Sequence, residues 1–159
     1  MTALEIPAAI LATARARGLT IATAESCTGG MLAACLTDPP GASDVFDRGF
    51  VTYSNAAKVA MLGVSPNTLA TDGAVSQAVA VEMAAGALHH AGVGLAISIT
   101  GIAGPGGSDH KPEGRVCFAI AQRGQPTRAE TVEFGALGRA QVRKAATDHA
   151  LALLATALS

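Results

Sequence analysis

The sequence has no tryptophan and only one tyrosine, and aromatic residues make up 3% of its 159 positions. Because hydrophobic residues still reach 50%, the core must be aliphatic, built largely from Ala, Val, Leu and Ile. Eighteen glycines with few large side chains indicate tight turns and closely packed backbones rather than disorder. A chain of this length predicts one domain over residues 1–159.

Charged residues are also scarce, at 14%, and the formal net charge is −1. This composition lacks the basic footprint of a nucleic-acid-binding protein and has no acidic or basic tail, so we expect no nucleic-acid partner. Few charges on a small protein leave much weakly polar surface, which favours self-association. We therefore expect a homo-oligomer, with a dimer as the simplest form.

Three cysteines, Cys27, Cys35 and Cys117, form no Cys-x-x-Cys pair, so neither a zinc site nor a redox motif is expected. Their odd number fits a reducing compartment. The N-terminal segment carries Glu5 and lacks the basic region of a signal peptide, and no apolar run approaches the length of a membrane span. We expect a cytoplasmic protein with no membrane partner, no metal and no other cofactor.

Periodicity and turn residues predict the order of helices and strands. Helices are expected to about residue 17, over 31–36, 56–63 and 77–92, and from about 137 to 158. Strands are expected over 19–25, 45–54, 94–100, 115–122 and 127–134, the last two as a hairpin. This pattern predicts an α/β fold, a three-layer α/β/α sandwich with a mixed sheet.

Capping residues refine the helix starts. Thr2 and Glu5 have the spacing of a capping box, Asn55 is the expected N-cap of the 56–63 helix, and Ser76 that of the 77–92 helix. The Ser-Pro and Thr-Asp-Gly segments that bracket residues 65–73 predict a loop there.

The segment Glu25-Ser26-Cys27-Thr28-Gly29-Gly30 puts a serine at a tight turn between a predicted strand and a predicted helix. Glycines let a substrate approach the backbone, and N–H groups at a helix start suit an oxyanion or a phosphate. An ordinary N-cap is the alternative interpretation. A Cys27 nucleophile is another, because a helix start favours a thiolate, although no histidine partner is placed for it.

The segment Tyr53-Ser54-Asn55-Ala56-Ala57-Lys58 could supply the base that a serine nucleophile needs. A lysine desolvated among alanines has a lowered pKa and can accept a proton. Viewed alone, a solvated helix lysine is the commoner case. The four histidines form no chelating pair and suggest no Ser-His-Asp order, so we interpret them as surface or helix-end residues.

The glycine-rich segment from Thr100 to Gly107 follows a predicted strand. Loops at strand ends of α/β sheets commonly hold ligands, and glycines expose backbone N–H groups that fit a phosphate or ribose. A flexible turn is the alternative.

Taken together, these segments resemble the CinA C-terminal domain family. The motifs AESCTGG, GFVTYSNAAK, LGV, GAVS, MAAGAL, TGIAGPGG and KPEGRV, followed by a helix with Arg139 and Arg143, occur in the family's order and spacing from about residue 19 to 155. Two positions differ from the common pattern. Leu137-Gly138-Arg139 stands where the family often has Gly-Asp-Arg, and Glu113 stands where it commonly has valine.

The family includes nicotinamide-nucleotide amidohydrolases, which convert nicotinamide mononucleotide to nicotinate mononucleotide and ammonia. The resemblance implies that Ser26 attacks the amide and that Lys58 takes its proton and returns one to the ammonia, with Tyr53 orienting Lys58 or the substrate. It also implies a substrate-binding set: Thr28, Gly29 and Gly30 around the oxyanion, Asn55 beside Tyr53, Thr100, Gly101, Gly106 and Gly107 at the nucleotide, and Arg139 and Arg143 at its phosphate.

A second interpretation is a non-catalytic module that binds a nucleotide or a partner, since the family takes its name from a competence- and damage-inducible protein. Intact Ser26 and Lys58 favour the enzyme over this module.

Overall fold

A computed structural model describes residues 2–159. The helices are α1 (Glu5–Ala16), α2 (Met31–Thr37), α3 (Asn55–Leu62), α4 (Pro66–Asp72), α5 (Gln77–Ala91) and α6 (Arg139–Leu158), with a 3-10 turn, η1 (Ala42–Asp44). The strands are β1 (Ile21–Glu25), β2 (Phe46–Val51), β3 (Leu95–Gly101), β4 (Arg115–Gln122) and β5 (Arg128–Glu133).

All five strands form one mixed sheet in the order β2-β1-β3-β4-β5. Strand β1 is parallel to β2 and to β3, whereas β3-β4 and β4-β5 are antiparallel. The predicted mixed sheet and its late hairpin are confirmed. The carboxyl ends of β1, β2 and β3 therefore share one edge of the sheet with the start of β4.

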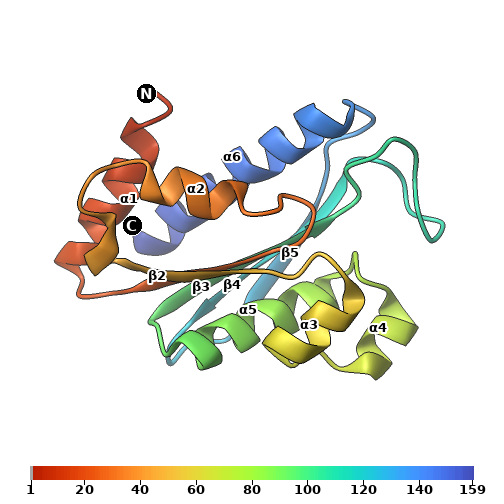
Figure 1. Cartoon of the computed structure of the whole chain (residues 1–159), viewed down its shortest axis with the longest axis horizontal. Coiled ribbons are helices and arrows are strands. Elements are labelled where there is room, and N and C mark those ends of the chain that lie inside the picture. Colours follow the sequence, from red (N-terminus) through yellow and green to blue (C-terminus); the bar gives the residue numbers. More distant parts are fainter. Residues whose placement is uncertain (1) are drawn as a thin grey trace.

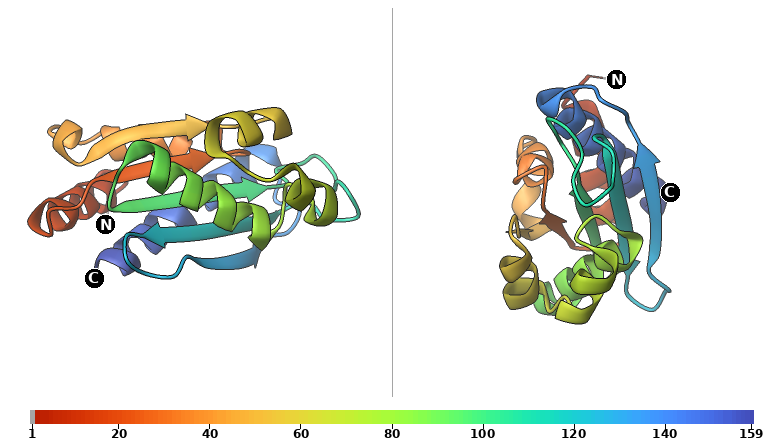
Figure 2. Two further views of the ribbon diagram at one scale, coloured as in Figure 1. Left: turned by 90° about the horizontal axis from the view of Figure 1, so that it is seen from below. Right: turned by 90° about the vertical axis from the view of Figure 1, so that its right-hand side faces the viewer.

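Helices cover both faces of the sheet, which confirms the three-layer arrangement. Helices α1, α2 and α6 lie on one face, and α3, α4 and α5 lie on the other (Figure 1). Figure 2 shows α5 running diagonally across its face. The first turns of α6, helices α3 and α4 and the loop between β3 and β4 all lie at the same end of the sheet (Figure 1).

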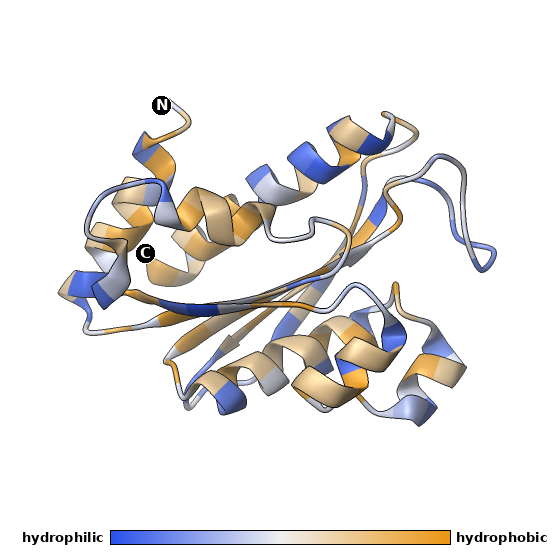
Figure 3. Ribbon diagram, viewed as in Figure 1, coloured by the Kyte–Doolittle hydropathy of each residue, from blue (hydrophilic) through white to orange (hydrophobic). Residues whose placement is uncertain are grey.

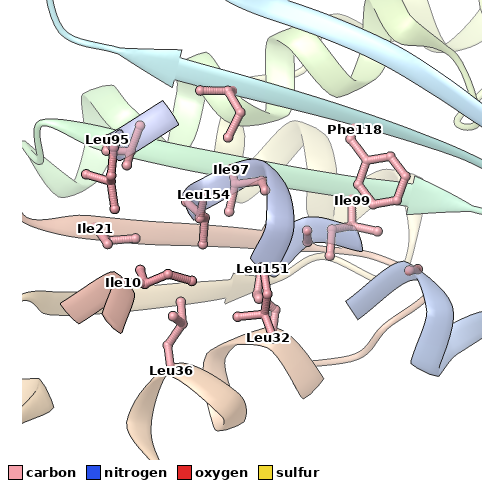
Figure 4. Close-up of a cluster of buried hydrophobic side chains, with 14 of the residues drawn as sticks. Ile10, Ile21, Leu32, Leu36, Leu95, Ile97, Ile99, Phe118, Leu151 and Leu154 are labelled. Carbon is pink, nitrogen blue, oxygen red and sulfur yellow. The ribbon is translucent and has the colours of Figure 1, made fainter. Parts of the chain in front are cut away.

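The larger core lies between the sheet and helices α1, α2 and α6. Figure 4 shows some of its buried side chains, which in the whole cluster are aliphatic except for Phe118 and Cys27. Each fully buried Leu or Ile of this kind stabilises the fold by roughly 1.5–3 kcal/mol.

The opposite face is built from smaller residues, which lets α5 approach closely. A Cβ atom added at Gly86 of α5 would lie only 2.0 Å from the carbonyl oxygen of Leu62 in α3. Glycine at this position therefore brings the two helices into direct backbone contact.

Three local predictions need correction. Ser54, not Asn55, is the N-cap of α3, and its hydroxyl oxygen accepts the N–H of Ala57. Residues 66–72 form helix α4 instead of a loop. At α1 the N-cap is Leu4, and only half of the predicted capping box is present, because the Glu5 carboxylate accepts the N–H of Thr2 while the Thr2 side chain caps nothing.

Polar residues of α6 gather in its first turns, at the end beside the loop between β3 and β4 (Figure 3). In the part of the chain that the structure describes, no helix combines the length and apolar character needed to span a membrane.

Candidate functional site

A cavity of about 310 Å³ opens where β1 and β3 end. This volume lies at the lower end of the range for small-molecule sites. Its lining comes from the Ser26 turn, the segment after β2, the 74–75 segment, the glycine-rich loop after β3 and the start of α6. The lining residues are Ser26, Cys27, Tyr53, Asn55, Lys58, Ala74, Val75, Thr100, Gly101, Ile102, Ala103, Gly104, Pro105, Gly106, Gly107, Ser108, Asp109, Lys111 and Arg139.

Ser26 and Lys58 contact each other at the floor of this cavity. Lys58 Nζ donates to Ser26 Oγ at 2.9 Å and to the carbonyl oxygen of Thr52 at 2.8 Å. If the amine is neutral, the first bond can reverse, and the serine O–H then donates to Nζ. A hydroxyl nucleophile and a base are thus within reach of a single proton transfer.

Lys58 is buried, with only 1% of its surface exposed. Lys58 lies in the first half of α3, directly after Ala56 and Ala57. Desolvation lowers the pKa of Lys58, because burial disfavours the charged ammonium. No salt bridge pairs it with a carboxylate among residues 2–159.

The turn that carries Ser26 is held from inside by Glu25, the buried last residue of β1. Its carboxylate accepts the hydroxyl of Thr28 at 2.6 Å and the N–H groups of Leu32 and Ala33 at 2.9 and 3.0 Å. These two N–H groups at the start of α2 are therefore occupied and do not face a ligand. Ser26 itself donates its N–H to the carbonyl of Ile99 on β3.

Arg143 holds the same turn from the side of α6. Its Nε donates to the carbonyl oxygen of Cys27 at 3.0 Å, and Nη2 approaches the carbonyl oxygen of Thr28 at 3.5 Å. A Cβ atom at Gly29 would lie 3.2 Å from Nη2, so glycine there lets the guanidinium come close.

Two N–H groups on buried residues of the turn stay without a protein acceptor. Neither Cys27 nor Thr28 donates its backbone N–H to another group within residues 2–159. Both residues are buried. Buried N–H groups are nearly always satisfied, and of these two residues only Cys27 lines the cavity, so its N–H is the one available to a bound ligand.

Cys27 is a poor candidate for the nucleophile. Burial raises the pKa of its thiol to about 11, which disfavours the thiolate that would react. No histidine is among the residues that line the cavity within the described chain.

The glycine-rich loop forms the wall opposite Ser26. Its tip is closed by paired backbone hydrogen bonds between Ser108 and Lys111. Lys111 Nζ donates to the carbonyl oxygens of Asp72 and Val75, each at 2.6 Å, which ties the loop to the segment before α5. Thr100 makes a similar tie, because its hydroxyl donates to the carbonyl oxygen of Ala74 at 2.8 Å.

Arg139 spans the mouth of the cavity. Nη1 donates to the carbonyl oxygen of Gly104 at 2.7 Å, and Nη2 donates to the hydroxyl of Tyr53. Tyr53 is 56% exposed, so it lies at the rim. Its hydroxyl makes no hydrogen bond to Lys58 in the described chain, and the structure therefore gives no support to a role in orienting that lysine.

The structure brings most of the predicted site residues together and separates four of them. Those that line the cavity are Ser26, Lys58, Tyr53, Asn55, Thr100, Gly101, Gly106, Gly107 and Arg139. Those that do not line it are Thr28, Gly29, Gly30 and Arg143. Sequence reasoning missed Lys111 in the lining and Glu25 behind the turn. The available signal for Glu25 was a carboxylate at the end of an otherwise apolar strand, since a buried carboxylate needs donors.

Besides Lys58, the ionisable side chains that line the cavity as charges are Lys111 and Arg139, which are positive, and Asp109, which is negative. This balance favours an anionic ligand. Over residues 2–159, no three His, Cys, Asp or Glu side chains cluster in a way that could hold a metal ion.

A model of the CinA C-terminal domain matches residues 4–158. The chain belongs to the CinA C-terminal domain family. A CinA-like protein of Chlorobium phaeobacteroides is 52% identical over 145 residues, which are 89% of this chain and 34% of that protein. The chain thus spans about a third of the length of this longer CinA relative.

Shorter family members match along most of their length. The nicotinamide-nucleotide amidohydrolase PncC of Escherichia coli K12 is 54% identical over 143 residues, covering 88% of this chain and 85% of PncC. Among solved structures of the CinA superfamily, the competence/damage inducible protein CihA of Agrobacterium tumefaciens is 45% identical with a TM-score of 0.93, covering 98% of this chain and 94% of CihA. The fold and the family are therefore established together.

Proposed function

We propose that this protein hydrolyses the carboxamide of nicotinamide mononucleotide to nicotinate mononucleotide and ammonia, with Ser26 as nucleophile and Lys58 as its base. One observation carries the mechanism: a buried lysine with no carboxylate partner lies 2.9 Å from a serine hydroxyl on a cavity wall. Its lowered pKa favours the neutral amine that can accept a proton.

In the first half-reaction, Ser26 Oγ forms a bond to the amide carbon while its proton passes to Lys58 Nζ. The resulting tetrahedral intermediate carries a negative oxygen. We assign the unpaired N–H group of Cys27, which lines the cavity, to this oxygen in place of the predicted residues 28–30. Lys58 then gives the proton to the amide nitrogen, the C–N bond breaks and ammonia leaves.

In the second half-reaction, a water molecule attacks the ester on Ser26. Lys58 accepts a proton from this water, and the ester C–O bond breaks as Lys58 returns the proton to Ser26 Oγ. The sum is the addition of one water to one amide, which gives one carboxylic acid and one ammonia. No group of the protein is consumed.

The choice of substrate rests on charge and on the relatives. Lys111 and Arg139 make the cavity favourable to a phosphate. The Escherichia coli relative, which is named a nicotinamide-nucleotide amidohydrolase, supports the nicotinamide nucleotide in particular. A module that only binds a nucleotide would gain nothing from burying Lys58 beside a serine, because burial of an unpaired ammonium costs several kcal/mol.

The test is to incubate the purified protein with nicotinamide mononucleotide and to measure both products. We expect equal amounts of nicotinate mononucleotide and ammonia, none with Ser26→Ala, and a much slower reaction with nicotinamide riboside, which lacks the phosphate. Ammonia release no faster than from the Ser26→Ala protein would overturn the proposal. Equal rates with the riboside would remove the phosphate from the recognition argument.

A further inference from the structure

Glu113, which does not line the cavity, joins two segments that do. Its Oε1 accepts the N–H of Gly106 at 2.7 Å, and its Oε2 accepts the N–H of Gly138 at 3.2 Å. Gly106 belongs to the glycine-rich loop, and Gly138 immediately precedes Arg139 at the start of α6. One carboxylate therefore uses both of its oxygens to fasten the loop to the helix start.

Arg139 joins the same two segments a second time. Its Nη1 donates to the carbonyl oxygen of Gly104, two residues before Gly106. The carboxylate of Glu113 and the guanidinium of Arg139 thus both link the loop to the start of α6. We call these three hydrogen bonds, to Gly106, Gly138 and Gly104, the ring. Without the carboxylate, the guanidinium would be the remaining side-chain link between the loop and α6.

The backbone at these positions is shaped for the carboxylate. Gly104, Gly106 and Gly138 all have positive φ angles, of 92°, 77° and 93°. A Cβ atom at Gly104 would lie 2.5 Å from the carboxyl group of Glu113. Hydrogen bonds from N–H groups to a carboxylate are roughly twice as strong as those between neutral groups.

We propose that Glu113 is a positioning residue: it fixes the glycine-rich loop relative to Arg139 and thereby sets the affinity for the anionic end of the substrate, while the chemistry at Ser26 is unaffected. This inference rests on the proposed function for the identity of the substrate. The ring of hydrogen bonds itself does not depend on that function.

Glu113→Gln tests the inference with almost no change in volume. A glutamine offers one acceptor oxygen and one donor NH₂, so it cannot satisfy both N–H groups. We expect the KM for nicotinamide mononucleotide to rise about three- to tenfold, with kcat within about twofold. The matched control is Glu133→Gln, because Glu133 pairs with Arg115 outside the cavity lining and should leave both constants unchanged.

A double-variant cycle separates positioning from a general loss of structure. If Glu113 acts through Arg139, adding Glu113→Gln to Arg139→Gln should raise the KM no further. An equal rise in both backgrounds, or a fall in kcat alone, would overturn the proposal. So would a Glu113→Gln protein that fails to fold, because the residue would then serve stability and not affinity.

An NMR measurement keeps the ring testable whatever the substrate. In the ligand-free protein, Glu113→Gln should shift the amide signals of Gly106 and Gly138, whereas Glu133→Gln should not. Unchanged amide signals would show that the ring is absent. If the wild-type protein releases no ammonia but these signals shift, the proposed function fails while the ring itself stands.

Discussion

Arg143 donates from α6 to the backbone carbonyl oxygen of Cys27, the residue directly after Ser26. Arg139, one helical turn earlier on the same helix, reaches the cavity mouth instead. The family resemblance implied that both arginines bind the phosphate. Their different contacts now predict different kinetic effects.

We expect Arg143→Gln to lower kcat about 10- to 100-fold with little change in KM, because a nucleophile displaced by a fraction of an ångström loses its alignment. We expect Arg139→Gln to raise the KM about tenfold with kcat within a few-fold, because it removes a cation from the cavity wall. Steady-state kinetics on the two proteins decides between these roles. An equal rise in KM for both variants would indicate that Arg143 also binds the phosphate.

Ser26 and Lys58 should behave as one unit. Ser26→Ala and Lys58→Ala should each lower kcat/KM by at least about a thousandfold, and the double variant should be little worse than either, because partners in one step are non-additive. Cys27→Ala is the neighbouring control and should stay within a few-fold of the wild type. Near-normal turnover by Lys58→Ala would contradict the pairing, and an inactive but folded Cys27→Ala would shift the nucleophile to the thiol.

The rate should rise with pH as Lys58 loses its proton. Because burial lowers the pKa of Lys58, this rise should be centred below the ordinary lysine value of 10.5. Between the folded and ordinary pKa values the unfolded chain binds more protons than the folded one, so stability also rises with pH there. A pH profile of kcat/KM tests the first statement. A rise centred at or above 10.5 would exclude a desolvated base.

The reaction should not need a metal ion. This expectation rests on the sequence, which has no cluster with ligand spacing, and on the absence of a three-residue ligand group within residues 2–159. Exhaustive chelation followed by the ammonia assay should leave the rate unchanged. A tenfold loss that added zinc or magnesium restores would refute the expectation.

The protein should form a homo-oligomer, with a dimer expected. Only 14% of its residues are charged, and large apolar side chains such as Val51, Met61 and Leu137 are exposed on its surface. Light scattering at micromolar concentration measures the mass directly. A monomer throughout that range would contradict the prediction.

Long periodic segments made most of the fold predictable from the sequence. Strands β1 and β3 follow from short apolar runs, β2 from β-branched and aromatic residues, and β4 and β5 from alternation, while helix α5 follows from its apolar face and its cap at Ser76. Helix α4 was not predicted. It spans only seven residues and none of them is fully buried, so its sequence shows no apolar stripe. Its Ser65-Pro66 start was interpreted as a loop, although serine at N-cap and proline at N1 is also a helix signal.

The site was predictable only where residue type alone indicates chemistry. Ser26 and Lys58 lie 32 positions apart, and the family resemblance paired them. Side-chain direction was not accessible: Arg139 and Arg143 are four residues apart on one helix, a rise of about 6 Å, yet they donate to different segments. Glu25 was overlooked because its role depends on two N–H groups of a helix, seven and eight residues later.

The isolation of Lys58 from any carboxylate has a consequence for selection. Keeping an amine in a dry environment costs folding free energy, and replacing it with an apolar side chain of similar length would relieve that cost. A screen for heat resistance alone would therefore enrich substitutions at this position and discard the base with them. Thermal stability and catalytic rate place opposite demands on the residue at position 58. Laboratory evolution of this protein must therefore select for both properties at once.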